Sequence, residues 1–316
     1  MFCIKDPGEI PLKPAPAPEP APAPAPAPAP EPELETAPAP TGGLAAAEAT
    51  DQSPFSKPAR ETVVLPAVAG QHAATIVWLH GLGDTGYGVS RWLAAMADPE
   101  NGESQPSIPF LDLPHIKWIF PSAPVAPVTI NRGRRAPSWY DVFGFNAGAP
   151  VDAKGIDAAA RYVAGILEEE KKANPDVTYA VGGISQGGAL SLYLMCRKML
   201  GRFEDGSDAS SIPLSASVAF STWLPKCSLT PAPGGSAAGA KAPVAERAAN
   251  HPLLMTHGEV DVLVGYDWGR DGVRELQEAG FSNLTFHSYP ELGHAMCPQE
   301  MAVLRAWLQT HLPPPA

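Results

Sequence analysis

A strict proline repeat divides this sequence into a part that cannot enter a packed fold and a part that can. Every even-numbered residue from Pro14 to Pro32 is proline, and alanine fills most of the positions between. Such a segment has few amide hydrogens and little apolar surface, so it forms an extended polyproline II chain. We expect residues 1–60 to be a disordered spacer tail; a ligand for a proline-binding module is the alternative, but the repeat lacks basic or aromatic anchors. Residues 61–316 then form the folded domain.

The folded part, about 250 residues, is long enough for one α/β domain with a large core. The whole chain has 22 Lys and Arg against 33 Asp and Glu, a net charge of −11. Proteins that bind polyanions carry a basic excess, so we expect no nucleic-acid partner. The sequence has no apolar run of membrane-spanning length, no signal or transit peptide, and cysteines without CxxC spacing. These features predict a cytoplasmic protein with free thiols.

Short apolar runs alternate with segments of helical periodicity from Thr62 onward. This alternation predicts βαβ units and a mostly parallel sheet with helices on both faces. Strands are expected at residues 74–79, 115–120, 178–181, 215–220, 252–256 and 284–289. Helices are expected at residues 91–97, 156–172, 189–200, 272–278 and 300–312. Residues 98–114, 202–212 and 227–246 resemble surface insertions.

The pentapeptide around Ser185 has the pattern GxSxG, and it lies between an expected strand and an expected helix. In this context a serine is presented on a sharp strand-to-helix turn, where only glycines fit beside it. The pattern therefore predicts a nucleophilic serine. The alternative is a glycine-rich helix start capped by Ser185.

A serine nucleophile needs a base and an acid that orients the base. In the order Ser, Asp or Glu, His, both partners follow Ser185 and lie after the carboxyl ends of strands. Asp261 and His294 satisfy both conditions, although Asp261 could also serve only in a loop-forming turn.

The other candidates for acid and base are placed less well. Asp267 and Asp271 are expected at the start of the next helix, where acidic side chains have a capping role. His257 is expected at a strand end and His287 within a strand, so both are expected to make structural hydrogen bonds.

An oxyanion site should complete this arrangement. One donor is expected to be the amide of Gln186, directly after the nucleophile, and the second should come from the glycine-rich loop at residues 80–86. That loop also matches a dinucleotide-binding fingerprint, but no acid is suitably placed after a second strand.

Several longer strings resemble the acyl-protein thioesterase/lysophospholipase family of α/β-hydrolases. They are LHGLGDTG (79–86), HIKWIFPSAPVAPVTIN (115–131), PSWYD (137–141), GGISQGGALSLY (182–193), STWLP (221–225), HGEVDVLVG (257–265) and LGHAMC (292–297). The strings occur in the family's order and extend over nearly all of residues 74–312.

The resemblance implies an α/β-hydrolase fold and a serine hydrolase that cleaves acyl thioesters, above all S-palmitoyl groups on protein cysteines. Lysophospholipase or short-chain carboxylesterase activity is the alternative. It implies Ser185 as nucleophile, His294 as base and Asp261 as orienting acid. It also implies oxyanion amides from Leu82 and Gln186, with no metal and no organic cofactor. The acyl groove is expected near Leu82, Phe143, Phe145, Trp223 and Leu263. Substrates are then S-acylated proteins or acyl lipids and esters.

The sequence departs from the family pattern in two places. The family usually has proline after the triad acid and at the end of an LVP string, where this chain has Val262 and Gly265. Loss of both prolines is expected to loosen the loop. Phe143 and Phe145 replace smaller aliphatic residues, which is expected to narrow the groove. A protein that binds acyl groups or a partner without catalysis is the non-enzyme alternative, and reaction with a fluorophosphonate distinguishes it.

Cys3 is the remaining feature of the tail. We expect it to be unmodified; S-acylation there is the alternative and would support only a weak, transient contact with a membrane surface.

Overall fold

The computed structural model describes residue 55 and residues 61–98, 110–144, 149–229 and 245–315. The predicted tail, with Cys3, and most of the insertions at 98–114 and 227–246 lie outside the described residues. None of the helices in the described ranges is both long and apolar enough to cross a bilayer. The described cysteines, Cys196, Cys227 and Cys297, are free thiols.

Seven strands form one sheet in the order β1-β3-β2-β6-β7-β8-β9. They are β1 (Val63–Leu65), β2 (Ala74–Leu79), β3 (Ile116–Phe120), β6 (Thr178–Gly183), β7 (Ala216–Phe220), β8 (Leu253–Gly258) and β9 (Leu284–Tyr289). All neighbouring pairs are parallel except β1 and β3, which are antiparallel. The expected mostly parallel sheet is therefore confirmed.

The chain changes direction across the sheet between β2 and β6. After β2 it adds β3 on one side, and then returns to place β6 on the other side of β2. Loops that leave the carboxyl ends of two strands diverge at such a point and open a crevice. The loops after β2 and β6 carry residues 80–86 and Ser185, so the topology itself places them together.

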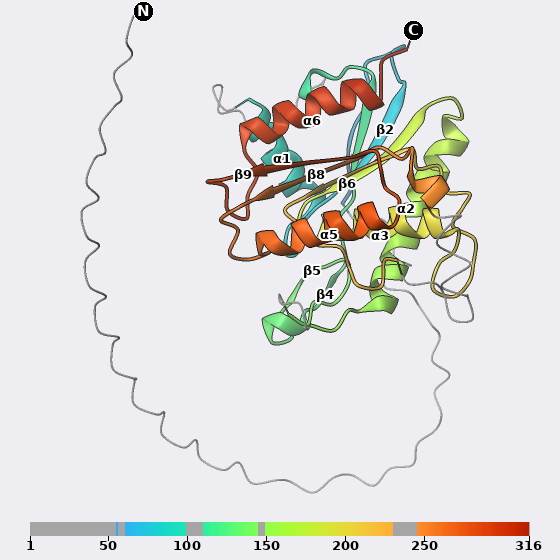
Figure 1. Ribbon diagram of the computed structural model, residues 1–316. Coiled ribbons are helices and arrows are strands. Elements are labelled where there is room, and N and C mark those ends of the chain that lie inside the picture. The colour runs from blue at the N-terminus through green and yellow to red at the C-terminus, as the bar shows by residue number, and fades with distance from the viewer. Residues whose placement is uncertain (1–54, 56–60, 99–109, 145–148, 230–244, 316) are drawn as a thin grey trace, which may run out of the picture. The chain divides into compact units, whose positions relative to one another are not determined.

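Helices cover both faces of the sheet. They are α1 (Gly86–Ala97), α2 (Ala153–Ala173), α3 (Gln186–Leu200), α5 (Tyr266–Glu278) and α6 (Pro298–His311). Figure 1 shows α1 and α6 on one side of the sheet and α2, α3 and α5 on the other. The side chains of β2 alternate accordingly: Val77 and Leu79 join the core under α2 and α3, whereas Ile76 and Trp78 join the core under α1 and α6.

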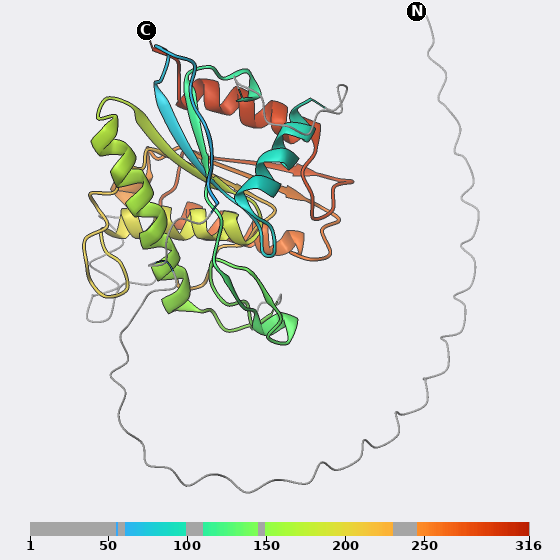
Figure 2. The ribbon, with the colours of Figure 1, turned by 180° about the vertical axis from the view of Figure 1, so that it is seen from behind.

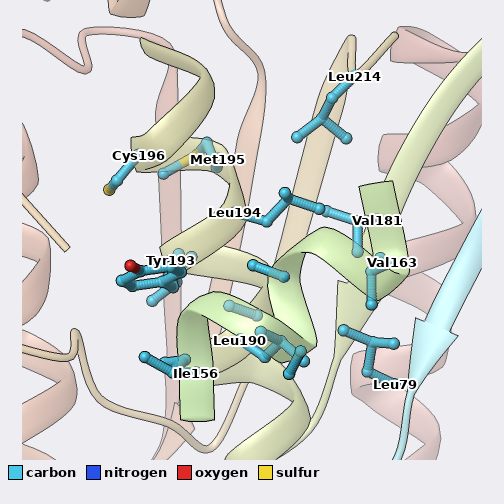
Figure 3. Close-up of a cluster of buried hydrophobic side chains, with 14 of the residues drawn as sticks. Leu79, Ile156, Val163, Val181, Leu190, Tyr193, Leu194, Met195, Cys196 and Leu214 are labelled. Atoms are coloured by element: carbon cyan, nitrogen blue, oxygen red, sulfur yellow. The ribbon is translucent and has the colours of Figure 1, made fainter. Parts of the chain in front are cut away.

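The core beneath α2 and α3 illustrates why these segments are helices (Figure 3). Ile156 and Val163 of α2 and Leu190 and Leu194 of α3 point into one apolar cluster with Leu79 of β2. Asp152 caps α2 by accepting the amide of Gly155, and two lysines occupy its last turn. An apolar stripe together with suitable caps is what a stable amphipathic helix requires.

All five expected helices begin earlier than the sequence pattern predicted, and α1 and α5 do so by the most. α1 begins at Gly86 rather than Arg91, and α5 begins at Tyr266 rather than Gly272. Glycines near both helix starts obscured the periodicity. Gly86 packs against the backbone of β3 and Gly269 against the ring of His257, where a Cβ would lie 2.0 Å from the Phe120 carbonyl oxygen and 2.4 Å from Nδ1.

The sequence analysis missed three short strands and misplaced one segment. β1 was not expected, nor was the antiparallel hairpin of β4 (Val125–Pro127) and β5 (Arg135–Pro137), which Figure 2 shows beside the main sheet. Two 3-10 turns, η1 (Phe110–Asp112) and η2 (Thr129–Asn131), complete the described elements. The segment 202–212 is not a surface insertion alone, because Phe203, Ala209 and Ile212 are buried in the core.

Candidate active site

Ser185 lies in a tight turn between β6 and α3. Its φ of 56° and ψ of −122° are unusual for a residue with a side chain and indicate local strain. The neighbouring glycines allow the turn. A Cβ on Gly183 would lie 2.5 Å from the backbone of Gly187, and a Cβ on Gly187 would lie 2.3 Å from the Leu79 carbonyl oxygen. The strand-to-helix context predicted for GxSxG is therefore present.

His294 and Asp261 meet Ser185 in a continuous hydrogen-bonded relay. Nε2 of His294 lies 3.0 Å from Oγ of Ser185, and Nδ1 lies 2.7 Å from Oδ2 of Asp261. Because Asp261 is an acceptor, Nδ1 carries a proton, which leaves Nε2 of the neutral ring free to accept one. The three residues thus come together in the order and geometry of a nucleophile, a base and an orienting acid.

The Asp261 carboxylate is held by backbone amides as well as by the histidine. Its Oδ1 accepts hydrogen bonds from the amides of Leu263 and Val264, each at 2.9 Å. Burial acts to raise the pKa of Asp261, but the hydrogen bonds from His294, Val264 and Leu263 outweigh it, so the pKa is lowered. The group is therefore suited to remain an anion beside the imidazole.

The loop that carries His294 packs against the end of β8. A Cβ on Gly258 would lie 2.1 Å from the Leu292 carbonyl oxygen, so only glycine permits this approach. The amide of Val260 also donates to that oxygen at 3.2 Å. The loops of the acid and of the base are thereby fixed to each other.

The rival residues lie elsewhere or act differently. His257 is buried and donates from Nε2 to the Val264 carbonyl oxygen at 2.8 Å, with Oδ2 of Asp261 at 3.5 Å. Burial lowers the pKa of His257, which favours a neutral ring. His287 is exposed on β9. Asp267 lies in the first turn of α5, but Asp271 lies beyond it and pairs with Arg274, so its expected place at the helix start was wrong.

Two free amides lie on the loops that flank Ser185. Gly81 packs against Ser185: a Cβ on Gly81 would lie 3.4 Å from the Cβ of Ser185, so the loop after β2 lies beside this serine. Within the described ranges, the backbone amides of Leu82 and Gln186 donate no hydrogen bond. Free donors on both sides of the serine are what an oxyanion site needs.

A cavity of about 170 Å³ opens between the loop after Tyr140, the loop after β7 and helix α5. Phe143 and Trp223, two of the residues expected in the acyl groove, line it, as does Trp268. Leu82 and Leu263 are not among its lining residues, and Phe145 lies outside the described residues. Leu263 instead is 47% exposed beside Asp261, together with Val262.

Two buried polar side chains near the relay were missed by the sequence analysis. Thr222 donates from Oγ1 to the carbonyl oxygen of Ser185 at 2.7 Å. Glu300 accepts from Oγ1 of Thr256 at 2.6 Å and from the amide of Cys297 at 3.0 Å. Burial raises the pKa of Glu300 to about 7 against these hydrogen bonds. A glutamate three residues after a helix cap is a capping-box signal, but a cysteine cap disguised it.

The chain is similar to several known carboxylesterases and acyl-protein thioesterases. A probable carboxylesterase of Oryza sativa subsp. japonica is 33% identical over 256 residues, covering 78% of this chain and 81% of that protein. Acyl-protein thioesterase 1 of Neurospora crassa is 31% identical over 262 residues, covering 80% and 93%. The crystal structure of Zea mays acyl-protein thioesterase 2 superposes with a TM-score of 0.67 at 38% identity, covering 80% of this chain and 99% of that one.

The family model that matches describes phospholipases and carboxylesterases, and it extends over residues 60–312. That range contains the whole sheet, its helices and the relay of Ser185, His294 and Asp261. The chain therefore has the α/β-hydrolase fold and belongs to the phospholipase/carboxylesterase family of hydrolases.

Proposed function

We propose that this chain is a serine hydrolase that removes S-acyl groups, above all palmitoyl, from protein cysteines. The observation that carries the proposal is the relay from Oγ of Ser185 through His294 to Asp261, at 3.0 and 2.7 Å. A serine hydroxyl is a weak nucleophile unless a base takes its proton as it attacks. In this arrangement Ser185 is the nucleophile, His294 the base and Asp261 the orienting acid.

Acyl transfer to the enzyme is the first half of the reaction. Oγ of Ser185 attacks the acyl carbonyl carbon while Nε2 of His294 takes the hydroxyl proton. The carbonyl electrons move to oxygen, where the amides of Leu82 and Gln186 stabilise the negative charge. The tetrahedral intermediate collapses, and His294 gives its proton to the leaving thiolate.

Hydrolysis of the acyl-enzyme is the second half. Water occupies the position of the departed thiol and gives a proton to His294 as it attacks the ester carbon. Asp261 stabilises the imidazolium in both halves, and its lowered pKa keeps it charged for that role. The second tetrahedral intermediate then expels Oγ of Ser185, which takes the proton back from His294, so the products are the free fatty acid and a regenerated Ser185. No residue other than these needs to exchange a proton.

The cavity beside Phe143 and Trp223 is the proposed site for the acyl chain, because its aromatic and aliphatic lining suits an apolar group. Leu82 is half-buried and Leu263 is exposed, and both are proposed to line the path between the cavity and Ser185. Relatives named as acyl-protein thioesterases favour a thioester substrate.

Short-chain ester hydrolysis is the second candidate, together with lysophospholipase activity. The relative from rice is named as a probable carboxylesterase, and Phe143, 42% exposed at the cavity, restricts the room for a long chain. The proposal further assigns residues 1–60 to a spacer tail and 61–316 to the catalytic domain. We also propose that the protein is cytoplasmic and contacts membrane surfaces transiently.

Matched thioester and oxyester substrates with acyl chains from two to sixteen carbons test the proposal. The wild type should turn over long-chain thioesters fastest, and Ser185→Ala should remove nearly all hydrolysis while leaving the melting temperature within a few degrees. A peak on short oxyesters would instead identify a carboxylesterase. Retention of a few per cent of the wild-type rate in Ser185→Ala would refute the assigned nucleophile.

A further inference from the structure

A short segment, residues 137–141, connects the two loops that carry the free amides; we call it the strap. Its carbonyl at Pro137 accepts the amide of Gly83 at 2.8 Å. Its Trp139 donates from Nε1 to the carbonyl oxygen of His80 at 2.9 Å. These two bonds lie on either side of Leu82 in the sequence, so the strap is fastened to the loop at both ends of the Leu82 peptide.

The side chain of Gln186 fastens the strap to the other loop. Its Oε1 accepts the amide of Trp139 at 3.2 Å, and its Nε2 donates to Oγ of Ser138 at 2.9 Å and to the Tyr140 carbonyl oxygen at 2.8 Å. Gln186 is only 1% exposed. A buried side-chain amide with three satisfied hydrogen bonds is held in one conformation, and its own backbone is held with it.

His80 fixes the loop after β2 from the opposite side. The amide of Ala123 donates to Nε2 of His80 at 2.9 Å, so the ring must accept there. Nδ1 then carries the proton and donates to the Gly81 carbonyl oxygen at 2.7 Å. Burial lowers the pKa of His80, which favours this neutral form. The Leu82 peptide is thus bounded by fixed hydrogen bonds on both sides.

These contacts give the strap a definite function. Gln186 contributes its amide to the proposed oxyanion site, and its side chain reaches, through Trp139, the loop that contributes the other amide. We propose that the side chain of Gln186 is a positioning residue, which sets the spacing between the two oxyanion amides by way of the strap. This inference rests on the proposed function.

A purely structural role for the Gln186 side chain would have a different consequence. Loss of buried hydrogen bonds lowers stability wherever they lie, whereas a displaced oxyanion donor weakens binding of the transition state more than binding of the substrate. A misplacement of about 1 Å in an active site can reduce the rate about 100-fold. The two roles therefore separate in the ratio of kcat to KM.

The variants are Gln186→Met, which removes all three side-chain hydrogen bonds, and Ser138→Ala. The second variant removes one acceptor of Gln186 and the hydrogen bond from Oγ of Ser138 to the Tyr140 carbonyl oxygen at 2.6 Å, and it leaves that carbonyl as an acceptor for Gln186. Tyr193→Phe is the matched stability control, because the Tyr193 hydroxyl donates to Oδ1 of Asp157 at 2.9 Å within the core under α2 and α3. That control breaks a buried hydrogen bond without touching the strap.

The measurements are kcat and KM on an acyl thioester and inhibition by a trifluoromethyl ketone with the same acyl chain. Oγ of Ser185 adds to the ketone carbon, its proton passes to His294, and the carbonyl electrons form an oxyanion on the ketone oxygen. The corresponding alcohol, which cannot add, reports binding alone.

We expect Gln186→Met to lower kcat about 10- to 100-fold with KM within about 3-fold of wild type. The inhibition constant of the ketone should rise by the same factor while that of the alcohol stays constant. The kcat of Ser138→Ala and its inhibition constant for the ketone should lie between those of Gln186→Met and wild type. This variant provides the test if Gln186→Met does not fold. Tyr193→Phe should change neither constant.

The inference is overturned if kcat is unchanged in both Gln186→Met and Ser138→Ala, or if only KM rises in them. It is also overturned if Tyr193→Phe loses as much kcat as these two variants. A wild type that turns over neither the acyl thioester nor the matched oxyester refutes the proposed function, and this inference falls with it. If the wild type turns over substrate, but Gln186→Met and Ser138→Ala have the same kcat and KM as Tyr193→Phe, only this inference is refuted.

Discussion

Ser185 lies in a turn enclosed by backbone, whereas Asp261 lies in a loop whose next residue, Val262, is 98% exposed. Around the serine, glycines stand where a Cβ would clash with backbone: that of Gly187 for Gly183, and the Leu79 carbonyl of β2 for Gly187. Around the aspartate, the loop is held by two amides on one carboxylate oxygen and by His257. The turn of Ser185, the proposed nucleophile, is thus positioned mainly by close packing, and the carboxylate of Asp261, the proposed acid, by a few hydrogen bonds.

This difference teaches where each half is sensitive. Close packing tolerates no added volume, but its geometry does not depend on charge. A hydrogen-bonded loop tolerates changes in side-chain size at its exposed positions, but it depends on which groups donate and accept. Substitutions that add volume on the first side should therefore affect folding and activity together, whereas changes of donor or acceptor on the second side should affect activity or pH dependence.

The largest expected effect comes from Asp261→Asn. The Oδ1 atom of asparagine can keep the amides of Leu263 and Val264, but its NH₂ group would face Nδ1 of His294 and impose the wrong tautomer. We expect kcat to fall about 10⁴-fold while the melting temperature changes by only a few degrees. Steady-state kinetics and calorimetry on the same preparation test this. A collapse of stability along with activity would show that the two sides are not held differently.

Glycine-to-alanine substitutions, one beside Ser185 and one in the loop of Asp261, provide the next test. Gly187→Ala should lower the free energy of unfolding by about 2 to 3 kcal/mol and abolish labelling by a fluorophosphonate, because its Cβ would lie 2.3 Å from the Leu79 carbonyl oxygen. Gly265→Ala should stabilise by about 0.4 to 1 kcal/mol, because φ is −53° and no atom lies within 4 Å of the added Cβ. Denaturant unfolding measures both. Equal effects of one sign would contradict the comparison.

Glu300 provides the last test, through the pH dependence of stability. Burial raises the pKa of Glu300 from 4.5 to about 7, so the folded protein keeps a proton that the unfolded chain has lost. Stability from this group is fully present below pH 4.5 and is lost as the pH rises toward 7. The loss amounts to at most about 3 kcal/mol.

Glu300→Gln should flatten this part of the stability curve and be more stable than wild type at pH 8. Its amide oxygen can accept from Cys297 while its NH₂ group donates to Thr256, whose hydroxyl can turn. Melting temperatures from pH 4 to 8 measure the slope, with Glu278→Gln, an exposed residue of α5, as the control. Identical slopes in wild type and Glu300→Gln would rule out Glu300 as the cause.

The central strands and the tight turn that carries Ser185 were predictable because their signals are local. The apolar run of β2 and the GxSxG string after β6 each specify their own structure. β1, only three residues long, is defined by pairing with β3, and nothing within Val63–Leu65 indicates that partner. The starts of α1 and α5 were hidden because their glycines serve packing against other elements.

At the site, too, residues with a local signal were predicted and contacts between distant segments were not. Asp261 and His294 were located from their places after parallel strands, a rule that follows from sheet topology. The attachment of Gln186 to the strap was not predicted. Gln186 and Ser138 lie 48 positions apart in the chain, and no local sequence pattern indicates that they meet. Leu82 and Leu263 were expected at the groove, but the cavity lies against α5, whose start the sequence had concealed.

The positive φ of Ser185 has a consequence for anyone who designs or selects variants of this chain. Glycine adopts such a conformation without the steric cost that serine bears. A library that randomises position 185 and is screened for thermal stability alone should therefore enrich glycine, and every improved clone would be inert. Only a screen that couples survival to turnover retains the serine, because stability and chemistry favour different residues at this position.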